Sequence, residues 1–334
     1  MAKVTIKEIA DILGVSTATV SRVLNNSGGY SEETKRRVLD VLKQYNYQAN
    51  AMAKGLRTKK TNSVGVVLPD LTNEYFAKIA VAIERVLMKK GYSINIYNMS
   101  EDANKEELML RDLESRGVDG LIYVSGYRNQ VNRVKELNIP VICVNQLEKM
   151  DETMPVIESD HEYGGYLAAK ALLERGTERI IMLRDERDIL PINQREQGFK
   201  AGLKEQHLRP LHISRIPFNV DAAQKEIADL LKNGKSFDGI FASSDILAIG
   251  ALKALQQHGL QVPDNVQIIG FDNVTFSQYS YPALTTIHQS TDQLGEKAAE
   301  RLIQSMQENH LDSNGRIVVP VHLVERETTQ AWRV

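Results

Sequence analysis

Short β-rich segments alternate with amphipathic helical segments from residue 62 onward, and this alternation restricts the possible folds more than any other feature of the chain. Strands that alternate with helices form parallel sheets covered by helices on both faces. The predicted strands are 64–68, 94–97, 121–124, 141–144, 180–183, 239–242 and 268–271. They fall into two series within a segment long enough for two domains. We therefore expect an α/β body of two similar, doubly wound lobes.

The composition is that of a globular protein. Hydrophobic residues make up 42% of the chain and charged residues 25%, which are globular values. No run approaches the ~18 apolar residues of a membrane span, and the N-terminal segment lacks the apolar region of a secretory signal peptide. The single cysteine, Cys143, excludes an internal disulfide and a CxxC site. We expect a cytoplasmic bacterial protein.

The net charge of −2 hides a strong asymmetry along the chain. Residues 1–60 carry a net charge of +6, and the remaining residues carry −8. A small basic segment attached to an acidic body indicates that one end of the chain binds a polyanion such as nucleic acid and that the other end does not.

The basic segment contains local signals for a small all-α domain of three helices. Thr5 and Glu8 form a capping box at the start of the first helix, and Gly14 ends that helix. Ser16 is a good N-cap for a second helix that ends near residue 24, and Ser31 caps a third helix. This order, with a short glycine-containing turn between the first two helices, is the plan of a helix-turn-helix domain.

The second helix of this domain is the candidate DNA-reading helix. Its short side chains would let it enter a major groove, and Arg22 could pair with the O6 and N7 atoms of guanine. The candidate major-groove residues are Thr17, Ala18, Ser21 and Arg22. The candidate contacts to the DNA backbone are Ser16, Thr19, Lys35, Arg36 and Arg37. On the pattern alone, a small helical bundle that binds protein is the alternative interpretation.

Residues 4–26, VTIKEIADILGVSTATVSRVLNN, make the reading specific. They are similar to the helix-turn-helix of the lactose-repressor/galactose-repressor family of bacterial transcription regulators. The family's core residues stand here as Ala10, Gly14-Val15-Ser16, Thr19-Val20-Ser21-Arg22 and Asn25. The resemblance continues through residues 244–274 and 281–303. It implies a regulator that binds a palindromic operator as a homodimer.

The resemblance also implies a hinge helix in the basic segment 46–60, which is too short to form a core. In the family this helix folds on DNA, and its leucine, here Leu56, inserts into the minor groove and kinks the duplex. The candidate minor-groove residues are Asn50, Ala53, Lys54, Leu56 and Arg57. A role for Leu56 in packing between domains is the alternative. Ala49 stands where the family usually has proline.

Polar and aromatic residues that follow the predicted strands suit a small polyhydroxylated ligand, because ligands bind at the carboxyl ends of strands in such sheets. The candidate effector-binding residues are Asp70, Asn73, Tyr75, Phe76, Arg195, Phe218, Asp245 and Asp272. Arg195, expected in a polar loop, matches the arginine of the family's Arg-x-x-Gly-aromatic run, and Asp272 matches the aspartate of its Gly-aromatic-Asp run. A helix N-cap is the alternative for Asp245, and a structural ion pair or cap is the alternative for Arg195 and Asp272.

The implied body resembles periplasmic sugar-binding proteins, with chain crossovers near residues 160, 290 and 320. The expected organisation is a helix-turn-helix domain (1–45), a hinge (46–60), an N-terminal lobe (61–160 plus 291–320) and a C-terminal lobe (161–290 plus 321–334). No leucine heptad follows residue 325, so a dimer is expected rather than a tetramer.

Several partners and functions stay open. A sugar or sugar phosphate is the first choice of effector; Ile189 lies near a position where purine-responsive members carry a basic contact, which disfavours a purine. A phosphocarrier protein bound to the body is a further possible co-regulator. No cofactor, metal or catalytic site is expected, because the seven histidines form no HExxH motif and no phosphate-binding glycine loop or nucleophile elbow is present. A stand-alone sugar-binding protein is the rival class.

Overall fold

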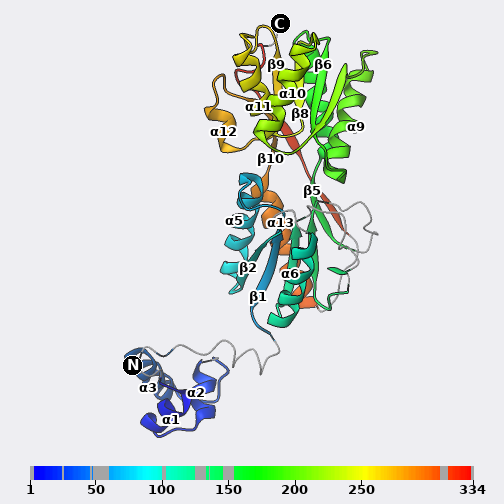
Figure 1. Ribbon diagram of the computed structural model, residues 1–334. Helices are drawn as coiled ribbons and strands as arrows, with labels where there is room; N and C mark the ends of the chain where they lie inside the picture. Colours follow the sequence, from blue (N-terminus) through cyan, green and yellow to red (C-terminus); the bar gives the residue numbers. More distant parts are fainter. Residues whose placement is uncertain are drawn as a thin grey trace. The chain divides into compact units, whose positions relative to one another are not determined.

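Figure 1 shows the computed structural model of the chain. The structure describes residues 4–24, 26–45, 47, 60–99, 103–124, 133–134, 136–145, 154–308 and 315–331. The chain divides into two compact units, Met1–Thr61 and Asn62–Val334. We call them the head and the body.

The described residues of the head form three helices, as the sequence predicts: α1 (Ile6–Leu13), α2 (Thr17–Leu24) and α3 (Glu32–Gln44). The capping box forms, because the Thr5 hydroxyl accepts a hydrogen bond from the Glu8 amide and the Glu8 carboxylate accepts one from the Thr5 amide. Gly14 ends α1 in the left-handed conformation, with φ at 67°. The core of the head is Ile9, Ala10, Leu13, Val20, Val23, Val38 and Leu42.

The first sheet of the body is entirely parallel, in the order β11-β5-β4-β3-β1-β2. Its strands are β1 (Ser63–Leu68), β2 (Ser93–Asn98), β3 (Gly120–Val124), β4 (Val141–Val144), β5 (Val156–Ser159) and β11 (Arg316–Val319). Helices α5 (Glu74–Lys89) and α13 (Thr291–Glu308) share one apolar cluster with it. Helix α6 (Ala103–Arg116) belongs to a second cluster.

The second sheet has the order β12-β10-β9-β8-β6-β7, and β12 alone pairs in the antiparallel sense. Its strands are β6 (Ile180–Asp185), β7 (His212–Ile216), β8 (Gly239–Ala242), β9 (Gln267–Asp272), β10 (Thr285–Gln289) and β12 (Val321–Val324). Its helices are α8 (His161–Glu174), α9 (Leu190–Lys204), α10 (Val220–Lys232), α11 (Asp245–Gln257) and α12 (Thr275–Tyr279). One apolar cluster includes α10 and α11, and another includes α8 and α9.

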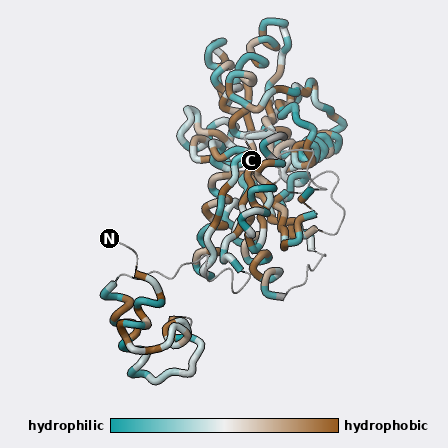
Figure 2. Tube along the Cα trace, turned by 60° about the horizontal axis from the view of Figure 1, so that its bottom comes forward, coloured by the Kyte–Doolittle hydropathy of each residue, from teal (hydrophilic) through white to brown (hydrophobic). Residues whose placement is uncertain are grey.

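The two sheets define two lobes, and the chain passes between them three times. It leaves the first sheet after β5, returns to it after β10 to form α13, and leaves it again between β11 and β12 (Figure 1). The apolar segments lie mainly inside the body, with hydrophilic segments around them (Figure 2). Among the described helices, none combines the length and the apolar character needed to span a bilayer.

Helices α8 and α9 approach each other unusually closely at two glycines. A side chain at Gly165 would overlap the carbonyl oxygen of Arg195, and one at Gly198 would overlap the carbonyl oxygen of Glu162. Because neither glycine carries a Cβ atom, the two backbones can pack directly against each other. This contact fixes α8, which carries His161, against α9, which carries Arg195.

Candidate functional site

The exposed face of α2 carries the residues predicted to enter the major groove. Thr17, Ala18 and Arg22 are exposed and Ser21 is half-buried. Val20 and Val23 of the same helix are buried. A short helix anchored by its apolar side, with small side chains and one arginine on the other, has the form of a groove-reading element.

The candidate backbone contacts differ in their surroundings. The Ser16 hydroxyl accepts a hydrogen bond from the Thr19 amide at 3.1 Å, so Ser16 is the N-cap of α2 as predicted. Lys35 pairs with Glu32 at 3.7 Å, and Arg36 is exposed. Arg37 donates to the carbonyl of Leu13 at 3.0 Å. This bond ties α3 to the end of α1, a role within the domain that the sequence did not reveal.

The candidate hinge residues Asn50, Ala53, Lys54, Leu56 and Arg57 lie outside the described residues. Their assignment stays a prediction from the sequence.

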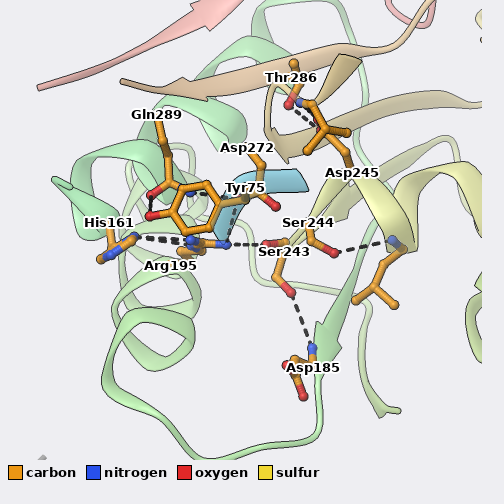
Figure 3. Close-up of polar contacts among 12 residues, drawn as sticks. Tyr75, His161, Asp185, Arg195, Ser243, Ser244, Asp245, Asp272, Thr286 and Gln289 are labelled. Atoms are coloured by element: carbon orange, nitrogen blue, oxygen red, sulfur yellow. Dashed lines mark hydrogen bonds and ion pairs between the residues drawn. The ribbon is translucent and has the colours of Figure 1, made fainter. Parts of the chain in front are cut away.

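In the body, Arg195 lies on helix α9. The expectation of a polar loop at this position is wrong, because Pro191 in the first turn favours the helix that follows Ile189. The Arg195 side chain is 7% exposed. Its guanidinium donates to the carbonyl of Ser243 at 2.5 Å and lies 3.7 Å from the Asp272 carboxylate (Figure 3).

Asp272 is the last residue of β9, and its carboxylate faces Arg195 on α9. Its carboxylate accepts a hydrogen bond from the Gln289 amide at 2.6 Å. Burial raises the pKa of Asp272 from 3.8 to about 6, although Arg195 and Gln289 oppose the shift. The site therefore holds a guanidinium donor, a carboxylate acceptor and an amide within one cluster, which is the donor and acceptor set that sugar hydroxyls need.

Asp245 lies beside this cluster but its oxygens are engaged within the C-terminal lobe. They accept hydrogen bonds from the Thr286 hydroxyl at 2.5 Å and the Val274 amide at 2.9 Å. Burial, and then the charge of Asp272, raise the pKa of Asp245 well above its usual range. The N-cap interpretation of Asp245 is wrong, because the N-cap of α11 is Ser244. Asp245 instead joins β10 and the loop after β9 to α11.

The N-terminal lobe contributes Tyr75 from α5. Its hydroxyl donates to the Gln289 side-chain oxygen at 3.3 Å, which links the two lobes (Figure 3). Burial, and then the Asp272 carboxylate, raise the pKa of Tyr75 to about 12, so the phenol keeps its proton. The rings of Tyr75 and Phe76 pack edge to face, with their centroids 5.2 Å apart.

Three further candidates bond to their own surroundings. The Asp70 carboxylate accepts from Thr72, and the Asn73 side chain caps α5. The Phe218 ring lies 5.1 Å from the guanidinium carbon of Arg187. The structure thus brings Arg195, Asp272 and Tyr75 into one cluster, while the side chains of Asp70, Asn73, Asp245 and Phe218 contact the other residues named above.

Sequence reasoning missed three residues at this cluster: Gln289, which contacts Asp272; His161, which contacts Arg195; and Asn145, which contacts His161. Gln289 ends β10, and Asn145 follows β4 directly, so both stand at the carboxyl ends of strands where ligand contacts gather. His161 is the first residue of α8, after the N-cap Asp160. The strand-end position of Gln289 and Asn145 was a usable signal; for His161 the sequence offers none.

The raised pKa of Asp272 predicts a measurable pH dependence. A carboxyl group whose pKa is higher in the folded state binds more protons there, so its contribution to the unfolding free energy falls as the pH rises from about 4 to about 6. Asp272→Asn removes this contribution. We expect the unfolding free energy of the variant minus that of the wild type to rise by about 2–3 kcal/mol from pH 4 to pH 7. Urea denaturation across this range would contradict the assignment if the difference stays flat or falls.

Comparison with known proteins gives matches in both units. Residues 5–50 match the family model "Bacterial regulatory proteins, lacI family", and residues 169–329 match "Periplasmic binding protein-like domain". A protein named ribose operon repressor, from Halalkalibacterium halodurans, is 36% identical and covers 98% of this chain and 97% of its own.

Two solved structures are similar to this chain. The lac repressor dimer bound to operator and the anti-inducer ONPF has a TM-score of 0.91 at 25% identity, covering 99% of this chain and 100% of its own. A LacI-family regulator from Enterococcus faecium with bound ribose has a TM-score of 0.72 at 29% identity, covering 80% and 98%.

Proposed function

The chain belongs to the lacI family of bacterial regulatory proteins, and from this membership we propose that it is a sequence-specific DNA-binding repressor of carbohydrate-utilisation genes, controlled by a small sugar bound between its lobes. One observation carries the effector class: the buried cluster of Arg195, Asp272 and Gln289 beside Tyr75 offers donors, acceptors and an aromatic surface together. Ribose bound to a structural neighbour, and the name of a 36% identical relative, make D-ribose the first sugar to test.

The proposed regulator differs from an enzyme and from a stand-alone sugar-binding protein in its basic head. The head has no place in a protein that only binds sugar, whereas a chromosomal operator requires it. Binding to chromosomal DNA places the protein in the bacterial cytoplasm, at the nucleoid when it is bound. We propose four parts: the helix-turn-helix domain (1–45), the hinge (46–60), the N-terminal lobe (61–160 plus 291–320) and the C-terminal lobe (161–290 plus 321–334). The limits of the two lobes fit the three points where the chain changes sheet.

The test of the effector class is a thermal-shift screen of the full chain. The panel contains pentoses, hexoses, disaccharides, sugar phosphates and purines. A ligand that binds only the folded state raises the midpoint, with about 2.7 kcal/mol gained at 100 times its dissociation constant. A shift with D-ribose supports the proposal; a shift with a purine alone replaces the sugar by a purine. A flat panel overturns the sugar effector and leaves control by a phosphocarrier protein.

For the DNA interface we propose that Thr17, Ala18, Ser21 and Arg22 of α2 read bases, with backbone contacts from Ser16, Thr19, Lys35, Arg36 and Arg37. The exposure of the α2 face supports this arrangement. Two heads of a homodimer would then read the two halves of a palindromic operator.

Arg22→Ala is expected to weaken operator binding by about 1–3 kcal/mol and to relax the preference at one base pair of each half-site. The reason is the loss of a bidentate pair with guanine. The measurement is binding of the variant to operators that differ at single positions, with Lys35→Ala as a control expected to weaken all sequences alike. Equal weakening by Arg22→Ala on every sequence would show that Arg22 contacts phosphate only.

For the hinge we propose that Leu56 inserts between central base pairs, flanked by Asn50, Ala53, Lys54 and Arg57. Leu56→Ala should reduce the bend of the bound operator and leave sugar binding unchanged, because alanine is too short to unstack a base step. Energy transfer between dyes at the operator ends measures the bend. An unchanged bend would leave Leu56 with a packing role only.

Three aromatic residues in and just after α12 are exposed, which fits a homodimer rather than a monomer. Phe276, Tyr279 and Tyr281 are 72%, 74% and 88% exposed. Aromatic side chains exposed together are typical of protein interfaces. We propose a second copy of the chain as the partner, since the structurally similar lac repressor is described as a dimer on its operator. Sugar binding that moves one lobe against the other would change the hinge spacing in this dimer and thus the DNA affinity.

A further inference from the structure

His161 lies between the two lobes and contacts a residue of each. It begins α8, and the residue is 1% exposed. Its Nε2 atom lies 3.1 Å from the side-chain oxygen of Asn145, which follows β4 of the first sheet. Its Nδ1 atom lies 3.3 Å from both Nε and Nη2 of Arg195 on α9 (Figure 3).

The chemistry of arginine fixes the protonation of this histidine. A guanidinium has only donors, so the Nδ1 atom that faces it must accept with its lone pair. The proton of the neutral ring therefore sits on Nε2, which donates to the Asn145 oxygen. Asn145, His161 and Arg195 thus form a directed chain of hydrogen bonds from one lobe to the other.

The remaining contacts of Arg195 show what this chain holds in place. The guanidinium carbon lies 3.7 Å from the centre of the Phe271 ring, which supports one face of the group. Nη1 faces the Ser243 carbonyl and Asp272, and Nε and Nη2 face His161. The guanidinium is therefore held on three sides, and the bifurcated contact to His161 sets its rotation.

We infer that His161 is a positioning residue for effector binding: its Nδ1 atom orients the Arg195 guanidinium, and its Nε2–H ties that orientation to Asn145 in the other lobe. This inference rests on the proposed function, in which Arg195 contacts the sugar. In this role His161 contacts no sugar hydroxyl and acts only through Arg195.

The charges around His161 keep it neutral, as this role requires. Burial lowers the pKa of His161 well below its usual range, and the positive charges of Arg195 on α9 and Arg316 on β11 lower it further. Arg316 is itself paired with the buried carboxylate of Glu158 on β5. With these groups facing it, His161 keeps the Nδ1 lone pair throughout the range around neutral pH.

Two substitutions separate positioning from packing. The side-chain oxygen of asparagine can stand near the position of Nδ1, whereas the amide of glutamine reaches toward the position of Nε2. We expect His161→Asn to retain D-ribose affinity within about threefold of wild type and His161→Gln to lose about tenfold or more, because the charged donor Arg195 then lacks its acceptor. Calorimetric titration of the full chain with D-ribose measures both, and urea denaturation tests that both variants are folded. Equal ribose affinity of the two folded variants overturns the inference.

A second measurement does not depend on the effector. Nitrogen NMR of the ligand-free full chain, labelled at histidine, should show His161 with the proton on Nε2 and without titration between pH 5.5 and 8. A proton on Nδ1, or a titration in this range, overturns the inference even if ribose binds. If the wild type binds no ribose, the proposed effector fails, and the NMR result alone still decides the role of His161.

Discussion

Gly198→Ala is expected to lower the unfolding free energy of the body more than an alanine substitution at any other described glycine. An alanine methyl group at this position would overlap the Glu162 carbonyl oxygen and stand 3.0 Å from the Tyr166 amide nitrogen. Both are backbone atoms of α8, so no side-chain rotation relieves the overlap. The two helices must move apart, which costs about 3 kcal/mol or more.

The same movement should also impair effector binding. His161 lies on α8 and Arg195 on α9, so separating the helices lengthens the hydrogen bonds between them. Urea denaturation gives the loss of stability, and calorimetric titration with D-ribose gives the loss of affinity.

Gly315→Ala is the matched control. Among the residues that the structure describes, its methyl group would meet Nη2 of Arg301 alone, at an ordinary 3.7 Å. We expect unfolding and ribose binding close to wild type. If Gly198→Ala lies within about 1 kcal/mol of this control, the direct packing of α8 on α9 is wrong.

Arg195→Ala is expected to abolish measurable effector binding and to lower the unfolding free energy by about 3–5 kcal/mol. The substitution leaves the buried Asp272 carboxylate without its cation and removes the donors proposed to bind sugar hydroxyls. Arg195→Lys keeps the charge but not the planar fork, so we expect it to recover part of the stability and little of the affinity.

Arg179→Ala provides the comparison for these variants. Arg179 pairs with Asp238, and its side chain is 54% exposed, so its removal should cost no more than about 1 kcal/mol. Full ribose affinity in Arg195→Lys would contradict a role for the guanidinium fork. An unfolding free energy equal to that of Arg179→Ala would contradict the buried pair.

The head and the central strands could be predicted because their signals are local. Capping residues and a short apolar stripe define α1 and α2 within a few residues of each other. All seven predicted strands occur. Strands β7, β11 and β12 were not predicted, because each lies at a sheet edge and alternates exposed with buried positions, without a continuous apolar run. The short β5 carries a buried glutamate, Glu158, and β10 has the mostly polar sequence Thr-Thr-Ile-His-Gln, so neither strand forms a continuous apolar run.

The effector cluster was predictable only in part. The family resemblance identifies Arg195 and Asp272, but the helix around Arg195 is rich in polar residues, and its sequence therefore resembles a loop. Gln289 contacts Tyr75, which is 214 residues away in the sequence, and His161 contacts Asn145 of the other sheet; both contacts form only when the two sheets are in place. A hydrogen bond between side chains so far apart in sequence leaves no periodic pattern in one sequence.

The most direct test of a sugar-controlled repressor is the effect of D-ribose on DNA binding. DNA selected from a random library by the full chain supplies the operator, and fluorescence anisotropy follows its binding as ribose is added. We predict that a palindromic sequence is enriched and that ribose changes its dissociation constant by about 5–150-fold, in either direction. Ribose affinity should change by the same factor when the operator is present. Selection of no palindrome, or operator affinity that no sugar of the panel alters, would contradict the account.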